Sequence, residues 1–189
     1  MWVCPQRTYG GPTDCAQLEL HIGYVYGSTS IPPHASRYVP QFVPGARLPH
    51  VWIEPSPSLA RSLPPAVDLR YVSEMKEDDR KQRRYSVLDL CSCRAFTLIS
   101  PKGTSFIENT ATAVDLLGEP QVPVNALTYD EDFSITVGKD DWLQATGLRS
   151  GGAVLVRPDQ HILALVQAET DAVGIANMLT THLGRSQGL

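Results

Sequence analysis

The sequence lacks a long apolar run and a strong excess of charge of either sign. No stretch approaches the ~18 consecutive apolar residues of a membrane-spanning helix, and the N-terminus carries Pro5, Gln6 and Arg7 where a signal peptide needs an apolar segment. The formal net charge is only −4 at pH 7, which gives no electrostatic reason to bind nucleic acid or an anionic membrane. We therefore expect a cytoplasmic protein with neither partner.

Cysteine is scarce, and its spacing excludes the usual cysteine chemistry. None of the four cysteines has zinc-ligand spacing, and Cys91-Ser92-Cys93 has one residue too few between its thiols for a C-x-x-C redox motif. We interpret Cys91 and Cys93 as small apolar side chains beside Leu90 rather than as nucleophiles. The five histidines are scattered along the chain, so we expect no metal site.

What the chain does contain is sufficient for a domain with a real core. Its 189 residues are 42% hydrophobic and 19% charged, which is ordinary for a globular protein and excludes disorder of the whole chain. Five prolines between Gly27 and Pro49 preclude long regular structure and indicate a long ordered loop. The mixed-charge run at residues 74–84, with four acidic and five basic residues, predicts a linker.

Hydrophobic periodicity and helix-end signals predict the secondary structure. Alternation predicts strands over Leu18–Tyr26 and His50–Glu54, the second with His50, Trp52 and Glu54 on one face. Beyond the linker we expect a strand, a helix, a parallel neighbouring strand, a short helix, a hairpin and a last helix with Thr170 as its candidate cap. Their ranges are 95–100, 105–117, 122–129, 140–146, 153–157 with 161–167, and 171–183.

This order of elements is that of a thioredoxin-like domain. We predict an α/β fold in which residues 85–189 form a thioredoxin-like domain with a central mixed sheet and flanking helices, after a loop-rich β segment over residues 1–73 and the linker at 74–84. A thioredoxin places two cysteines where its first strand meets its first helix, because the helix N-terminus stabilises a thiolate. Here that position reads Ser100-Pro101-Lys102-Gly103, which excludes dithiol exchange.

Four ordered strings carry a resemblance to a known family. They are Tyr24-Val-Tyr-Gly-Ser28, Pro44-Gly-Ala-Arg-Leu-Pro-His50 followed by Trp52, Leu88-Asp-Leu90 before Phe96-Thr-Leu98, and Gly152-Ala-Val-Leu-Val-Arg-Pro-Asp159 with His161. Over residues 18–184 they resemble the C-terminal part of the FAD-dependent aromatic and polyketide hydroxylases, which are phenol-hydroxylase-like monooxygenases. The resemblance implies a thioredoxin-like last domain without redox cysteines, used for packing and dimer contacts, after a segment that completes the catalytic body.

The sequence departs from this family in its glycine motifs. The fingerprint G-x-G-x-x-G, whose glycines let a pyrophosphate approach a helix N-terminus, is absent, as is the family's later Gly-Asp motif. We therefore expect no FAD and no other cofactor. The family's D-G-H-x-A-W-R also becomes Asp159-Gln-His-Ile-Leu-Ala-Leu165, which weakens any role for this hairpin.

Candidate functional residues gather between the first strand and the Pro-Gly-Ala-Arg loop. Cofactor-free chemistry needs shape, a proton donor or acceptor, and a dipole or cation facing developing negative charge. We assign catalytic roles to Tyr24 as donor to a carbonyl, Arg47 as partner of an enolate or carboxylate, and His50 as proton exchanger. The substrate-binding candidates are Tyr26, His34, Arg37, Tyr38, Trp52 and Glu54. The alternative is structural, with Arg47 paired to an acid and His50 bonded to backbone.

Three functions fit these observations. The first is a cofactor-independent tailoring enzyme, descended from a hydroxylase that lost its FAD domain, which cyclises, isomerises or dehydrates a polyketide-like or aromatic secondary-metabolite intermediate. The second is a non-catalytic module that forms a homodimer or docks on a separate flavin monooxygenase. The third is a gene fragment with no independent role. We favour the first, because a docking module alone would not need residues 18–54.

Overall fold

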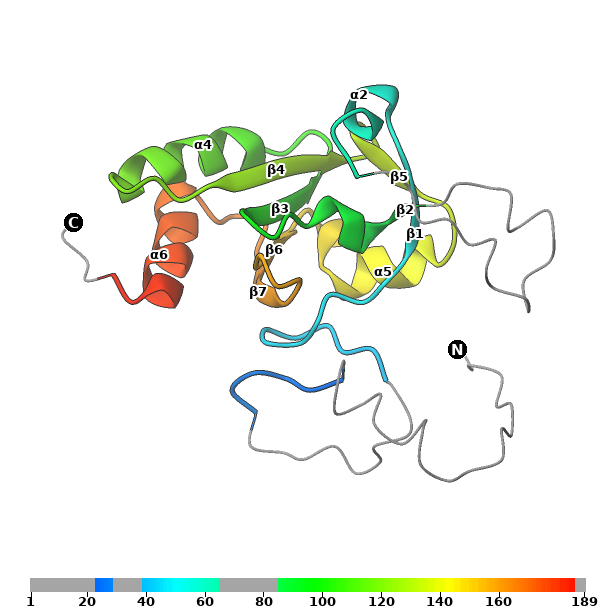
Figure 1. The fold of residues 1–189 in the computed structure, drawn as a ribbon, viewed down its shortest axis with the longest axis horizontal. Helices are drawn as coiled ribbons and strands as arrows, with labels where there is room; N and C mark the ends of the chain where they lie inside the picture. Colours follow the sequence, from blue (N-terminus) through cyan, green and yellow to red (C-terminus); the bar gives the residue numbers. More distant parts are fainter. Residues whose placement is uncertain (1–22, 29–38, 65–84, 186–189) are drawn as a thin grey trace.

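A mixed sheet of seven strands forms the centre of the molecule (Figure 1). The structure, a computed structural model, describes residues 23–28, 39–64 and 85–185. The strand order is β2-β1-β5-β4-β3-β6-β7. The strands are β1 (Trp52–Pro55), β2 (Tyr85–Ser86), β3 (Phe96–Pro101), β4 (Val124–Tyr129), β5 (Phe133–Ile135), β6 (Ala153–Val156) and β7 (Ile162–Val166). The α-helices are α2 (Pro57–Ala60), α4 (Phe106–Leu117), α5 (Lys139–Ala145) and α6 (Ala172–Leu183), and the 3₁₀ turns are η1 (Val87–Leu90) and η2 (Leu148–Ser150).

Four of these strands form the thioredoxin-like core that the sequence predicts. β3 and β4 are parallel neighbours connected through α4, while β6 pairs antiparallel with both β3 and β7. Because β3, α4, β4, α5, the β6–β7 hairpin and α6 follow one another in the predicted order, the predicted α/β fold class is confirmed.

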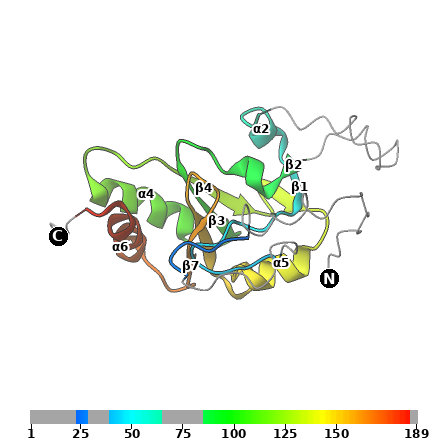
Figure 2. The same ribbon diagram turned by 60° about the horizontal axis from the view of Figure 1, so that its bottom comes forward.

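Helices cover both faces of this core. On one face, α4 and α6 lie side by side (Figure 2) and contribute Phe106 and Leu179 to a cluster with Leu98 of β3. On the other face, Trp142 of α5 belongs to a cluster with Ile99 of β3. Successive residues of a strand point to opposite faces, so β3, which is buried from Phe96 to Ser100, is covered on both sides, as is usual for a central strand.

Strands β1 and β2 extend the sheet beyond the thioredoxin-like part. β1 pairs antiparallel with β5, and β2 pairs antiparallel with β1. Ile53 of β1 is buried in the same cluster as Phe133 of β5 and Leu48 of the preceding loop. The segment before the predicted linker therefore shares a core with the residues after it. The linker itself, 74–84, lies outside the described residues, and the domain boundary stays a prediction.

Three local predictions are corrected by the structure. The cap of α6 is Asp171, whose carboxylate accepts the Gly174 N–H at 2.9 Å, and not Thr170; a carboxylate is favoured there because it also faces the positive end of the helix. The sequence Ser105-Phe106-Ile107-Glu108 has the spacing of a capping box, but Ser105, which precedes α4, makes no side-chain cap bond. The described end of the predicted 18–26 strand is a single bridge followed by a turn at residues 26–27.

Candidate active site

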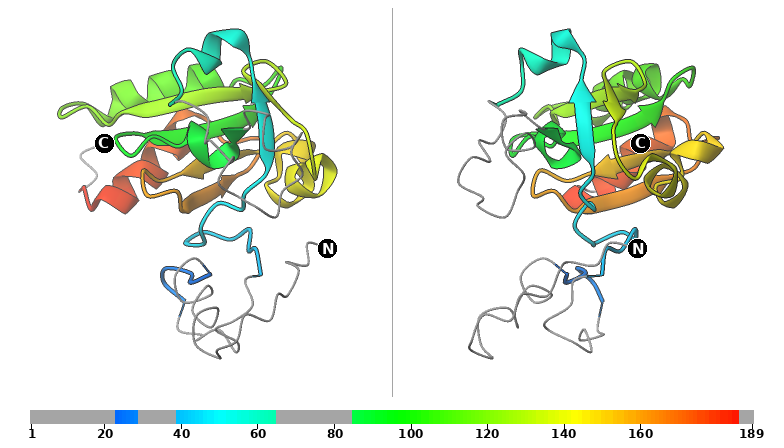
Figure 3. Two further views of the ribbon diagram at one scale, coloured as in Figure 1. Left: turned by 45° about the vertical axis from the view of Figure 1, so that its right-hand side comes forward. Right: turned by 90° about the vertical axis from the view of Figure 1, so that its right-hand side faces the viewer.

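Three segments form a small irregular layer beside the β6–β7 hairpin: residues 24–26, 45–48 and 160–162. The first two share one antiparallel bridge, and the second and third share another, which pairs Arg47 with His161. Three backbone hydrogen bonds of 2.8 Å join the second segment to the third. Figure 3 shows the chain that leads into β1 running past this hairpin. The structure thus places the Tyr24 segment next to the Pro-Gly-Ala-Arg loop, and it places the hairpin turn beside these segments.

Tyr24, Tyr26 and His161 form an aromatic cluster on this layer. The two tyrosine rings lie edge to face with centroids 4.9 Å apart, and their hydroxyl oxygens are 3.1 Å apart. The His161 ring centroid is 5.3 Å from that of Tyr24 and 4.8 Å from that of Tyr26. The guanidinium of Arg157, which is paired with Asp159, lies 4.7 Å from the Tyr26 ring centroid, within range of a cation–π attraction.

His161 carries an acceptor atom without a partner inside this cluster. The residue is only 5% exposed, and its Nδ1 lies 2.9 Å from the Asp159 carbonyl oxygen, to which only an N–H can donate. In the neutral ring Nε2 is then the acceptor. Within the described part of the chain Nε2 has no hydrogen-bond partner although it is buried. Leaving such a group unpaired costs about 1–3 kcal/mol.

The tyrosine pair supplies a proton donor beside this acceptor. Its hydrogen bond with Tyr26, followed by partial burial, raises the pKa of Tyr24. The phenol therefore keeps its proton at neutral pH and can donate it in a hydrogen bond. Together the cluster presents a hydroxyl donor, an imidazole acceptor and the Arg157 cation.

Arg47 is held by the hairpin turn. Its Nη2 donates to Oε1 of Gln160 at 2.8 Å, so its partner within the described ranges is an amide rather than the acid of the structural alternative. Gln160 has a φ of +68°, in the left-handed region that disfavours residues other than glycine. Its Nε2 also donates to the Leu88 carbonyl at 3.3 Å. The side chain that replaces the family's glycine here therefore joins the turn to two other segments.

We expect Gln160→Gly to be more stable than Gln160→Ala. Both variants lose the two side-chain hydrogen bonds, each worth about 0.5–1.5 kcal/mol, but only glycine relieves the left-handed strain of about 1–2 kcal/mol. Relative to the parent chain, the alanine variant should lose about 1–3 kcal/mol and the glycine variant about 2 kcal/mol or less. Urea denaturation followed by circular dichroism measures both. An alanine variant as stable as the glycine variant would show that the φ of Gln160 carries no strain.

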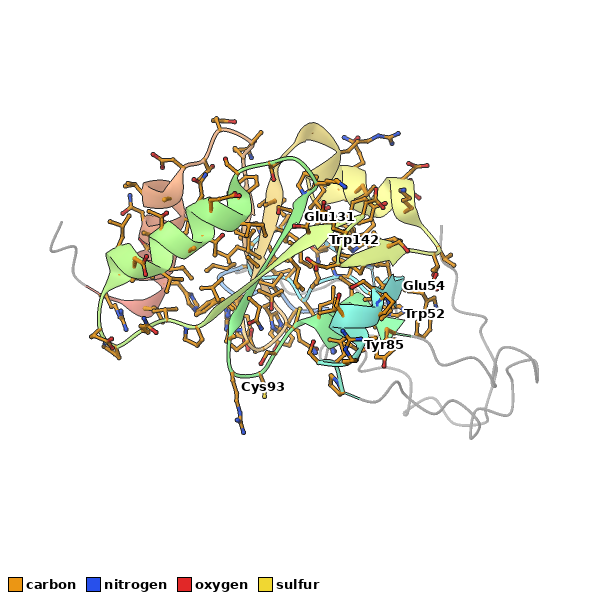
Figure 4. The ribbon with its side chains drawn as sticks, turned by 90° about the horizontal axis from the view of Figure 1, so that it is seen from above. Trp52, Glu54, Tyr85, Cys93, Glu131 and Trp142 are labelled. Atoms are coloured by element: carbon orange, nitrogen blue, oxygen red, sulfur yellow. The ribbon has the colours of Figure 1, made fainter. Side chains whose placement is uncertain are left out.

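His50 belongs to a second group of contacts. Its Nδ1 lies 2.6 Å from Oγ of Ser86, a side-chain partner rather than the backbone partner of the structural alternative. Its ring lies edge to face with Trp52 at a centroid distance of 4.4 Å. Burial lowers the pKa of His50, and the Asp89 carboxylate partly offsets this. Figure 4 shows Trp52, Glu54 and Tyr85 on the adjoining strands β1 and β2.

The remaining predicted site residues are divided between the surface and the undescribed part of the chain. Glu54 is exposed on β1, opposite Ser134 in the register with β5. The predicted residues His34, Arg37 and Tyr38 lie outside the described residues. No grouping of three or more metal-ligating side chains occurs in the described ranges, and none of the helices described there has the length and apolarity needed to cross a membrane.

The two neighbouring cysteines have opposite environments. Cys91 is buried, which raises the pKa of its thiol to about 12. Cys93 is exposed, so interpreting both as apolar side chains is wrong for Cys93. The reason is the turn that follows η1, which leaves the second thiol outside the core.

Iodoacetamide should therefore distinguish the two thiols. Only the thiolate reacts, and each pKa unit changes its fraction tenfold. Because the pKa of Cys91 lies about three units above the ordinary thiol value, we expect Cys91 of the folded chain to react on the order of 1000-fold more slowly than exposed Cys93. Peptide mass spectrometry measures each site separately, and in denaturant the two rates should converge. Equal rates in the folded chain would contradict the burial of Cys91.

Solved structures of flavin hydroxylases share this fold. A ternary complex of aklavinone-11 hydroxylase with FAD and aklavinone is 22% identical with a TM-score of 0.53, over 85% of this chain and 25% of that one. The flavin-dependent monooxygenase PieE, in complex with FAD and substrate, is 22% identical with a TM-score of 0.52, over 90% and 27%. Native and K252c-bound RebC-10x is 23% identical with a TM-score of 0.50, over 89% and 24%. The chain spans about a quarter of the length of these proteins.

The sequence itself identifies the family. The family described as "Aromatic-ring hydroxylase, C-terminal" matches residues 70–186, so the chain belongs to this family of C-terminal hydroxylase domains. The resemblance drawn from the four sequence strings is thereby confirmed. No curated protein sequence gives a significant match.

Proposed function

We propose that this chain is a cofactor-independent tailoring enzyme that moves a proton on an aromatic or polyketide-like secondary-metabolite intermediate, and so isomerises, cyclises or dehydrates it. The observation that carries the proposal is the buried Nε2 of His161, which has no hydrogen-bond partner in the described part of the chain, in a ring packed against the rings of Tyr24 and Tyr26. The substrate class is supported by the related structures, which hold aklavinone in one case and K252c in another.

The proposed reaction is a proton transfer next to a carbonyl group. Tyr26 is 48% exposed and covers one side of His161, so displacement of its ring by a planar substrate gives access to Nε2. His161 Nε2 then takes a proton from the carbon next to the carbonyl, while the Tyr24 hydroxyl donates a hydrogen bond to the carbonyl oxygen as it becomes negative. The proton returns from His161 to another carbon or to the oxygen, which gives the isomer without net oxidation.

One residue that the sequence did not single out, Arg157, joins this proposal, and the predicted catalytic residues Arg47 and His50 take other places in it. Arg157 supplies the nearby positive charge, because its guanidinium lies over the Tyr26 ring. Arg47 positions Gln160 and the turn that carries His161. His50 belongs to the second group of contacts and takes no part in this step.

Deuterium exchange into anthrone, a polycyclic aromatic ketone, tests this proposal. Proton NMR follows the loss of its methylene signal in deuterated buffer with purified chain and no added flavin. We expect exchange above the buffer rate, a fall of about 100-fold in His161→Gln, as for loss of a general base, and a smaller fall in Tyr24→Phe. Tyr129→Phe, which removes a buried hydroxyl on β4 away from the cluster, is the matched control. Exchange at the buffer rate, or only after FAD and NADPH are added, would refute the proposal.

A second candidate is a non-catalytic module that forms a homodimer or docks on a separate flavin monooxygenase. It is supported by exposed apolar side chains on the segments around the cluster, since Val39 is 52% exposed and Val43 is 41% exposed. Light scattering over a range of concentrations tests the homodimer. A dimer that Val43→Glu dissociates would support the homodimer, and a monomer at all concentrations would exclude it.

A further inference from the structure

A serine and a histidine lie in direct hydrogen-bond contact away from the aromatic cluster. His50 stands two residues before β1, and Ser86 ends β2, where it is opposite Trp52 in the register between the two strands. This pairing brings Ser86 Oγ within 2.6 Å of His50 Nδ1. A serine hydroxyl bonded to an imidazole is the arrangement by which proteins activate a serine as a nucleophile.

The hydroxyl of Ser86 is fixed by its position before η1. Its oxygen accepts the Leu88 N–H at 3.1 Å, and its own backbone N–H donates to the Asp89 carboxylate at 2.7 Å. Because Ser86 Oγ accepts the Leu88 N–H through one lone pair, its own hydrogen points in another direction and can be donated to a second partner. His50 Nδ1 is the acceptor within reach, provided that its ring is neutral and carries its hydrogen on Nε2.

The surroundings of His50 favour that neutral form. Partial burial of the ring lowers the pKa of His50, which favours the neutral form that can accept a proton. The edge-to-face contact with Trp52 fixes one side of the ring. The preceding residue is fixed as well, because the Pro49 carbonyl accepts the indole N–H of buried Trp142 at 3.1 Å. Both members of the pair are thus held in place by other contacts.

We propose that Ser86 is an acyl-accepting nucleophile with His50 as its general base, acting on esters of small carboxylic acids. Ser86 Oγ bonds to the ester carbonyl carbon while its proton passes to His50 Nδ1. The carbon–oxygen bond of the ester breaks, the leaving alkoxide takes the proton from His50, and an acyl ester of Ser86 remains. Water then attacks that ester while its proton passes to His50; the bond from the acyl carbon to Ser86 Oγ breaks, Ser86 Oγ takes the proton from His50, and the acid leaves.

The chain contains a serine that separates this role from simple helix capping. Ser56 is the cap of α2; its Oγ accepts the Leu59 N–H at 3.3 Å and contacts Oγ of Ser58 at 2.9 Å. Both serines therefore cap a short helix, but only Ser86 has a histidine bonded to its hydroxyl among the contacts described. If Ser86 is only a cap, the two hydroxyls should react alike.

Acetylation by p-nitrophenyl acetate, located by peptide mass spectrometry, tests the proposal. We expect Ser86 to acquire the acetyl group at least about 100-fold faster than Ser56, with release of p-nitrophenolate. His50→Gln keeps the serine cap and should lower the rate at Ser86 to that at Ser56, with an unchanged circular dichroism spectrum. Ser86 reacting no faster than Ser56, an unchanged rate in His50→Gln, or acetyl on His50 with Ser86 unmodified would each overturn it. The assay does not involve His161, so its failure is distinct from failure of the anthrone experiment.

Discussion

Replacing Trp142 with alanine should lower the free energy of unfolding by about 3–5 kcal/mol, the usual effect of truncating a buried tryptophan. Trp142 of α5 is 2% exposed and belongs to the core cluster that includes Leu48, Ile99 and Ile162. Its truncation leaves a cavity where the loop before β1 meets the thioredoxin-like part. Domains of this size are stable by only about 5–15 kcal/mol, so a large share of the total would be lost.

Trp142→Phe separates the packing contribution from the hydrogen bond. Phenylalanine keeps much of the ring volume but cannot donate to the Pro49 carbonyl, which the indole N–H reaches at 3.1 Å. An acceptor left unpaired in this way should cost about 1–3 kcal/mol. Pro49 precedes His50, so loss of this hydrogen bond should loosen the position of the His50 ring beside Ser86. We therefore also expect slower acetylation of Ser86 in Trp142→Phe.

Urea denaturation followed by far-ultraviolet circular dichroism measures both Trp142 variants. Leu116→Ala is the control, because Leu116 of α4 is 40% exposed and a surface truncation should change stability by about 0.5 kcal/mol or less. A loss below about 1 kcal/mol in Trp142→Ala would mean that α5 does not carry this part of the core.

The elements that could be predicted from the sequence are those with strong local signals. β3 and β4 are rich in apolar and β-branched residues, α4 has helix-end signals, and the β6–β7 hairpin has two apolar runs separated by a turn; all four are confirmed by the structure. β5 was not predicted because it has three residues and is stabilised by pairing with β1, far away in the sequence. Two-residue β2 has no pattern of its own for the same reason.

The site could be predicted only where its parts share a motif. The proximity of the Tyr24 segment to the Pro-Gly-Ala-Arg loop followed from the resemblance. His161 stood in the same quoted strings but received no role, because the change from glycine at residue 160 weakened the case for the hairpin. Its unpartnered Nε2 depends on three segments meeting. The contact of His50 with Ser86 joins residues 36 positions apart, which no local pattern could indicate.

Gly45→Ala should detach the Tyr24 segment from the hairpin layer. Gly45 has a φ of +88°, and a Cβ atom added to it would lie 2.3 Å from the backbone oxygen of Tyr26. Alanine therefore meets both the left-handed strain of about 1–2 kcal/mol and a clash with backbone, for which overpacking of about 1–3 kcal/mol is typical. We expect the free energy of unfolding to fall by about 2–5 kcal/mol in total. If residues 24–26 instead detach from the layer, the clash is relieved and the fall is smaller.

Hydrogen exchange at the Tyr26 amide distinguishes these two outcomes. This N–H donates to the Gly45 carbonyl at 3.0 Å, so its protection reports whether the segment stays attached. Gly27→Ala is the matched control: its φ is +82°, but an added Cβ meets no atom within 4 Å, so it should lose only about 1–2 kcal/mol and keep the Tyr26 amide protected. Since the proposed proton transfer needs Tyr24 beside His161, anthrone exchange should fall in Gly45→Ala and persist in Gly27→Ala. Equal effects of the two variants would show that the close approach to Tyr26 is not what requires glycine at residue 45.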